Sequence, residues 1–156
     1  MNSTALDVQL LDEAYDMAGA SDHFKIHETE DMIGALHFEN MIYTLADRGM
    51  ESYSGGLWEP AEIVGTVQGT RVSATILCRT GMVGDVVKFT NHFGNEVEVD
   101  GLLVCAYLTM LGHLNAMEQG SENDFHHDNY YAISDILQSS AELSDSDRRA
   151  MFKLID

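Results

Sequence analysis

The sequence predicts one α+β domain spanning residues 1–156, with a small antiparallel β-sheet of three to four strands in the middle of the chain, flanked and covered by about four to five helices. Two observations predict this class. Apolar residues recur at helical spacing in both end regions, whereas β-branched and alternating residues fill the middle region, residues 55–99. A chain of 156 residues also has the length of one ordinary domain.

The first fifty residues predict two helices. Thr4–Gly19 carries apolar residues at helical spacing and ends at a glycine. The polar stretch Ser21–Glu30 is predicted as a loop. A second helix is expected from about Glu30 to Asp47, because Arg48-Gly49 places a cation in the last turn and a glycine after it.

The middle region predicts strands. Thr70–Arg79 is rich in β-branched residues, and Asp85–Asn91 and Asn95–Val99 flank His92-Phe93-Gly94, which is typical of a hairpin turn. The sheet is expected to begin near Trp58, which should be buried, after a glycine pair of which at least one member has positive φ.

Three helices are expected in the last third of the chain. Asp100 is a suitable N-cap for Gly101–Glu118, which is apolar nearly all round and is therefore predicted to be the central buried helix. Asp124–Ser139 forms the next helix. Ser144 and Asp147 resemble a capping box that opens the last one.

The charge balance favours a protein partner over a nucleic acid. There are 26 Asp and Glu against 8 Lys and Arg, which gives a net charge of −18. Such a field repels phosphates, so we expect no direct nucleic-acid binding and no membrane binding. It fits a partner with a basic surface, including a protein that normally grips DNA, although acidity also serves solubility alone.

Cysteine usage and hydropathy predict a cytoplasmic protein. Cys78 and Cys105 lie in apolar runs and are expected to be buried free thiols. The chain opens without a basic-then-apolar signal pattern, and its longest apolar-rich stretch, Gly101–Leu114, is too short to span a bilayer.

The histidines are the obvious candidates for chemistry, but their spacing does not support a metal site. His23 and His27 are four residues apart without a third ligand, and the adjacent His126 and His127 point to different sides of a helix. His113 is expected to be a satisfied core histidine. Nucleophile, phosphate-loop and dinucleotide motifs are absent, so we expect no cofactor, no metal and no catalysis.

The acidic residues near the N-terminus predict a candidate interaction surface on outer helix faces. Rows of such carboxylates can imitate DNA phosphates, or they can contact a protein partner specifically. The residues of this candidate surface are Asp12, Glu13, Asp16, Glu28, Glu30 and Asp31.

One segment resembles a known family. The hexapeptide Tyr53-Ser54-Gly55-Gly56-Leu57-Trp58 is similar to the signature of the ArdB/KlcA antirestriction proteins, carried by plasmids and phages. Val87–Val99 is similar to the family's second and third strands around an Asn/Gly turn. Asp100–Leu114 resembles its Asp-initiated apolar helix, and Met151–Asp156 its closing Phe-x-x-Ile-Asp. Glu59-Pro60-Ala61-Glu62 replaces the family's usual Asn-Phe-Tyr-Glu, so the chain resembles a divergent member.

The resemblance implies a cytoplasmic protein of the host cell that protects incoming DNA from restriction, chiefly by type I systems. It implies a protein partner such as the type I restriction complex, no cofactor and no catalysis. The alternative is an acidic interaction or regulatory module, or a DNA mimic, aimed at another host DNA-binding or defence protein.

Overall fold

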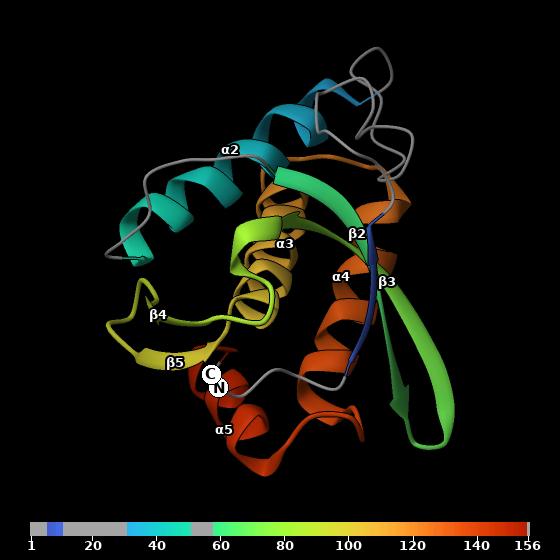
Figure 1. Ribbon diagram of the computed structural model, residues 1–156. Helices are drawn as coiled ribbons and strands as arrows, with labels where there is room; N and C mark the ends of the chain where they lie inside the picture. Colours follow the sequence, from blue (N-terminus) through green and yellow to red (C-terminus); the bar gives the residue numbers. More distant parts are fainter. Residues whose placement is uncertain (1–5, 11–30, 51–57, 156) are drawn as a thin grey trace.

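The computed structural model describes residues 6–10, 31–50 and 58–155, in which five strands form two antiparallel sheets beside four helices (Figure 1). The predicted α+β class is therefore confirmed. The strands, however, form a three-stranded sheet and a separate two-stranded sheet, where the sequence predicts one sheet.

The larger sheet has the order β1-β2-β3. Its strands are β1 (Asp7–Leu10), β2 (Trp58–Val67) and β3 (Thr70–Arg79), the last with the predicted bounds. Gln68 and Gly69 join β2 to β3, and both have positive φ, 51° and 81°. A two-residue loop with positive φ at both positions matches the twist of a long hairpin, which sets the register Val67 opposite Thr70.

The helix predicted for Thr4–Gly19 is wrong for the part that the structure describes. Residues 7–10 are a strand that pairs antiparallel with β2, with Asp7 opposite Val64. The backbone groups of β2 on this side find partners in β1, whereas Asp7 and Val8 are poor helix formers. Residues 11–19 lie outside the described part of the chain.

The predicted hairpin forms the second sheet, β4 (Val86–Thr90) with β5 (Glu96–Asp100). The Asn91 side chain closes its turn, since Oδ1 accepts hydrogen bonds from the backbone N–H groups of Phe93 at 3.0 Å and Asn95 at 2.9 Å. Its Nδ2 donates to the carbonyl of Leu154, which ties the hairpin to the last helix.

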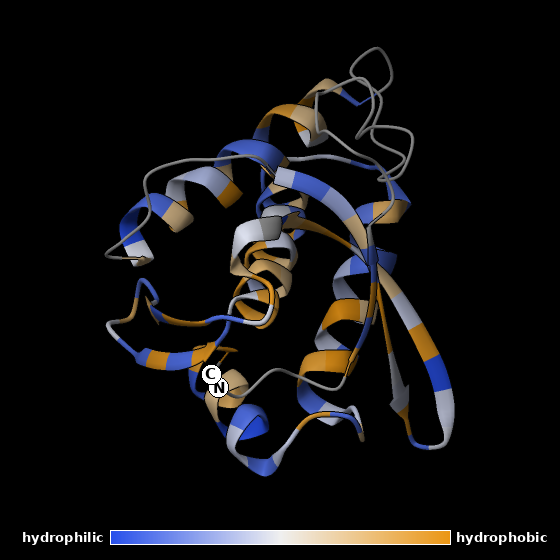
Figure 2. Ribbon diagram, viewed as in Figure 1, coloured by the Kyte–Doolittle hydropathy of each residue, from blue (hydrophilic) through white to orange (hydrophobic). Residues whose placement is uncertain are grey.

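The central helix α3 (Gly101–Glu118) is capped by Asp100, whose Oδ1 accepts from the N–H of Leu102 at 2.9 Å. It lies between α2 (Met32–Gly49), α4 (Asp124–Ser139) and β3, and Figure 2 shows hydrophobic colour along much of α3 and on parts of α4 and β3. The predicted bounds of α3 and α4 are confirmed, and α2 is shifted by two residues at each end.

The last helix, α5 (Asp145–Ile155), starts at the predicted capping residue, because Ser144 Oγ accepts from the N–H of Asp147 at 3.1 Å. Cys78 and Cys105 are both buried free thiols, as predicted. Among the described residues, none of the helices combines the length and apolar character needed to cross a membrane.

Trp58 opens β2 and is buried, with 4% of its surface exposed, as the sequence predicts. Its ring packs at a tilt against Tyr43, with 5.7 Å between ring centroids. Gly55 and Gly56 lie outside the described residues.

Replacing Trp58 by alanine should lower the free energy of unfolding by about 3–5 kcal/mol, because a large buried ring leaves a cavity that the core cannot refill. Urea denaturation measures this loss. Phe93→Ala, at a site 68% exposed, is the control and should change stability little. Equal effects of the two substitutions would contradict a core role for Trp58.

Candidate functional site

A buried chain of hydrogen bonds joins four side chains that are far apart in the sequence. Asp31 Oδ2 lies 3.1 Å from His126 Nε2, and His126 Nδ1 lies 2.8 Å from His113 Nδ1. His113 Nε2 in turn lies 2.7 Å from Asn129 Nδ2. The chain therefore connects the start of α2, the middle of α3 and one face of α4.

The direction of these hydrogen bonds follows from Asn129. The backbone of Thr75 holds the Asn129 side-chain amide in one orientation. The N–H of Thr75 donates to Asn129 Oδ1 at 3.0 Å, and Asn129 Nδ2 donates to the carbonyl of Thr75 at 2.7 Å. The second Nδ2 proton is then donated to Nε2 of His113, which must donate through Nδ1 to His126. His126 donates through Nε2 to the Asp31 carboxylate. Both imidazoles are neutral in this arrangement.

Burial favours the same neutral state. Burial, followed by the neighbouring His126, lowers the pKa of His113 well below its ordinary value. Burial also lowers the pKa of His126, although Asp31 opposes the shift. For Asp31, burial acts to raise the pKa, but hydrogen bonds from the N–H of Gly34, from Ser121 and from His126 outweigh it and leave the pKa below its usual value.

Local sequence allows this close approach. A Cβ at Gly34 would collide with Asp31 Oδ2 and with His126 Nε2, so only glycine fits where α2 passes the pair. The rings of Phe38 and Phe125 flank His113, with centroid distances of 4.5 Å and 5.7 Å.

This chain of hydrogen bonds is suited to holding helices together and not to reacting with a ligand. All four ring nitrogens of His113 and His126 are engaged by protein groups, which leaves none to bind a metal or take a substrate proton. Both histidine side chains are fully buried. The prediction that His113 is a satisfied core histidine is confirmed, as is the opposite orientation of buried His126 and exposed His127.

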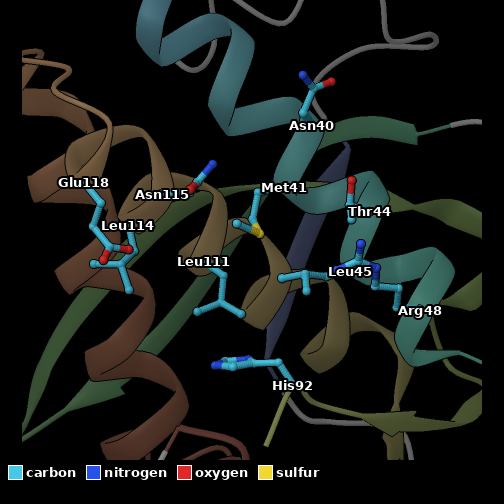
Figure 3. A pocket seen from close by; sticks show the side chains of 10 residues that line it. All are labelled: Asn40, Met41, Thr44, Leu45, Arg48, His92, Leu111, Leu114, Asn115 and Glu118. Atoms are coloured by element: carbon cyan, nitrogen blue, oxygen red, sulfur yellow. The ribbon is translucent and has the colours of Figure 1, made fainter.

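A cavity of about 430 Å³ lies between α2 and α3 and extends to the β4–β5 turn (Figure 3). This volume is within the range of small-molecule sites, about 300–1,000 Å³. Its floor is apolar and its rim polar. The floor is formed by Met41, Leu45, Leu111 and Leu114, and the rim by Asn40, Thr44, Arg48, His92, Asn115 and Glu118.

The structure describes two of the residues predicted for a site. Trp58 of the hexapeptide is buried at the start of β2, while Tyr53, Ser54, Gly55, Gly56 and Leu57 lie outside the described residues. Of the acidic surface, Asp12, Glu13, Asp16, Glu28 and Glu30 also lie outside them.

Asp31 was expected on an outer acidic face, and its position corrects that expectation. Its side chain is only 11% exposed, because it caps α2 through the N–H of Gly34 and accepts hydrogen bonds from His126 and Ser121. These internal partners leave its carboxylate unavailable for an interaction surface.

An acidic surface does exist elsewhere, on α4, where the sequence reasoning did not place one. Asp124, Asp128 and Asp135 are exposed and lie on one face with the exposed Tyr131, at positions i, i+4, i+11 and i+7. We call these three carboxylates the α4 acidic face. A signal for it was present in the sequence, since residues 89–147 contain no Lys or Arg, while Asp and Glu recur from Glu118 to Asp147.

Comparison with protein-family models finds no match, and no curated protein matches this sequence. Within residues 6–10, 31–50 and 58–155, no group of three or more His, Cys, Asp or Glu side chains is arranged to hold a metal ion.

Gly34→Ala should destabilise the protein, although alanine is normally favoured over glycine within a helix by up to about 1 kcal/mol. The added methyl must displace the Asp31–His126 pair, and overpacking of this kind costs about 1–3 kcal/mol. Gly81→Ala is the control, since its Cβ would meet no heavy atom within 4 Å. Chemical denaturation of both variants gives the comparison, and stabilisation by Gly34→Ala would refute the tight contact.

Stability should fall as the solution is acidified just below the ordinary histidine pKa of about 6.5. The unfolded chain binds protons at both histidines there, whereas the folded state binds fewer, because both pKa values are lowered. The unfolded state therefore holds more protons, and the free energy of unfolding decreases with decreasing pH by up to about 1.4 kcal/mol per pH unit for each histidine. Asp31 does not contribute in this window, since its pKa is lowered from the ordinary carboxyl value and the group stays ionised in both states.

Urea titrations between about pH 7.5 and 5.5 measure this slope. His126→Gln should make the slope shallower, and His127→Gln is the matched loss of an imidazole from the exposed side of α4. A stability that does not change over this range, or a slope that His126→Gln leaves intact, would contradict the neutral histidine pair.

Proposed function

We propose that this protein is an antirestriction protein, which protects incoming plasmid or phage DNA from host restriction, chiefly by type I systems. It acts in the host cytoplasm by binding a protein partner or by indirect inhibition, and not by catalysis. The observation that carries the proposal is the hexapeptide Tyr53–Trp58, since the family comparisons add no support of their own.

The order of elements after the hexapeptide agrees with the resemblance. Trp58 begins a buried strand, β4 and β5 flank a turn that contains Gly94 and Asn95, and Asp100 opens an apolar helix. The chain closes with Phe152 and Ile155 on α5. This agreement supports the proposal, but it concerns the order of helices and strands. A partner would contact exposed residues of the surface.

The α4 acidic face is the surface that we assign to the partner. Asp124 and Asp128 are about 6 Å apart along the helix axis, and Asp128 and Asp135 are about 10 Å apart. Phosphates of one DNA strand recur evenly at about 3.4 Å along the duplex axis. The uneven and wider spacing favours a specific contact with a basic protein surface over imitation of DNA.

Expression of the protein should raise the plating efficiency of unmodified phage on a host with a type I restriction system. The same phage on a host without restriction, and phage already modified by the host, are controls whose plating should not change. Equal plating of unmodified phage on the restricting host with and without the protein would overturn the proposal.

Neutralising the α4 acidic face should reduce this protection. The combined variant D124N/D128N/D135N removes three exposed charges, each worth about 0.5 kcal/mol in a surface ion pair, which corresponds to about tenfold weaker binding. The control D47N/D85N/E98Q changes the net charge equally at exposed sites on other elements. The same loss in both variants would assign the effect to overall charge, and full protection by the α4 variant would exclude this face.

A further inference from the structure

We propose that the cavity between α2 and α3 binds a small amphipathic anion, in which an apolar body carries one carboxylate. This inference is independent of antirestriction activity. It concerns a ligand of the size that the cavity of about 430 Å³ accepts.

The floor of the cavity provides the apolar part of the site. Met41 and Leu45 lie one turn apart on α2, and Leu111 and Leu114 lie about one turn apart on the facing side of α3. None of the four is fully buried, so apolar surface stays uncovered between the two helices. An apolar body in the cavity would remove this surface from water, which favours binding.

The polar residues at the rim differ in charge between the two sides of the cavity. Figure 3 shows Arg48 and Thr44 on the α2 side of the cavity, with the Arg48 guanidinium beside Leu45, whereas Asn115 and Glu118 lie on the opposite, α3 side. Arginine and threonine donate hydrogen bonds, and the glutamate carboxylate only accepts them. A ligand carboxylate is therefore favoured beside Arg48 and disfavoured beside Glu118, which gives the ligand one orientation.

Arg48 is available for this role. Arg71, Lys88 and Arg148 each lie within 4.0 Å of a carboxylate, namely Asp7, Glu96 and Asp145. Arg48 has no carboxylate partner among the described residues, in a protein whose net charge is −18. The planar guanidinium fork matches a carboxylate in a bidentate contact, which favours this head group over a neutral one.

The experiment uses octanoate as the probe, with octanol and octylammonium as probes of equal chain length. Binding is followed by amide chemical shifts of the full-length protein in about 150 mM salt, where the Debye length of about 8 Å screens the field of the distant carboxylates. Octanoate is expected to bind saturably, with the largest shifts on α2 and α3 near the cavity, and about tenfold more tightly than octanol or octylammonium.

Two variants separate the head group from the apolar floor. Arg48→Gln should lower the affinity for octanoate about tenfold and leave that for octanol unchanged, whereas Arg149→Gln, which removes an equal charge from an exposed site on α5, should change neither. Leu111→Trp should fill the cavity and weaken both probes. Equal affinity for the three probes, equal effects of the two arginine variants, or no saturable octanoate binding would each overturn the proposal.

Discussion

The structure depends on the need to bury helix α3 on every side. An amphipathic helix can leave one face to water, but α3 is apolar nearly all round, and every residue from Gly101 to Met110 is buried. Five described elements cover it, with α2, α4 and β3 making the most extensive contacts and β4 and β5 making smaller ones.

The few polar side chains on α3 fix how that cover is arranged. Thr109 Oγ1 accepts from the N–H of Leu77 on β3, and the Tyr107 hydroxyl donates to the carbonyl of Leu154 on α5. His113 bonds to His126 and Asn129 on α4. Apolar packing alone is tolerant of small shifts, whereas a buried polar atom without its partner costs about 1–3 kcal/mol. Three polar residues therefore specify the positions of three covering elements.

The sequence predicts those features that depend on neighbours in the chain. The bounds of β3, α3 and α4, and the caps Asp100 and Ser144, follow from local periodicity and capping chemistry, and all are observed. The strand β1 could not be predicted in this way. The pattern of its four residues is compatible with a helix and with a strand. Pairing with β2, which lies far along the chain, makes it a strand.

The hydrogen-bond chain could not be predicted for the same reason, because its members are far apart in the sequence. The position of His113 within an apolar helix indicates that it needs a polar partner, but nothing in the nearby sequence identifies that partner as His126 or Asn129. Asp31 lies in an acidic stretch that predicts exposure, and its contact with His126 places it inside the protein. The cavity could not be predicted from the sequence either. Arg48 and Glu118 are far apart in the chain, and only the packing of α2 on α3 places them at opposite ends of the cavity.

The buried network and the two outward surfaces are physically connected. Ser121, in the short connection between α3 and α4, donates to both Asp31 oxygens, at 2.8 Å and 2.9 Å, while Asp31 also caps α2. One carboxylate therefore fixes the start of α2 against the α3–α4 connection, which lies between Glu118 at the cavity and Asp124 on the α4 acidic face. Surfaces carried by helices that are tied in this way are ordered before any partner arrives. Binding to them then costs less conformational entropy than binding to a mobile loop.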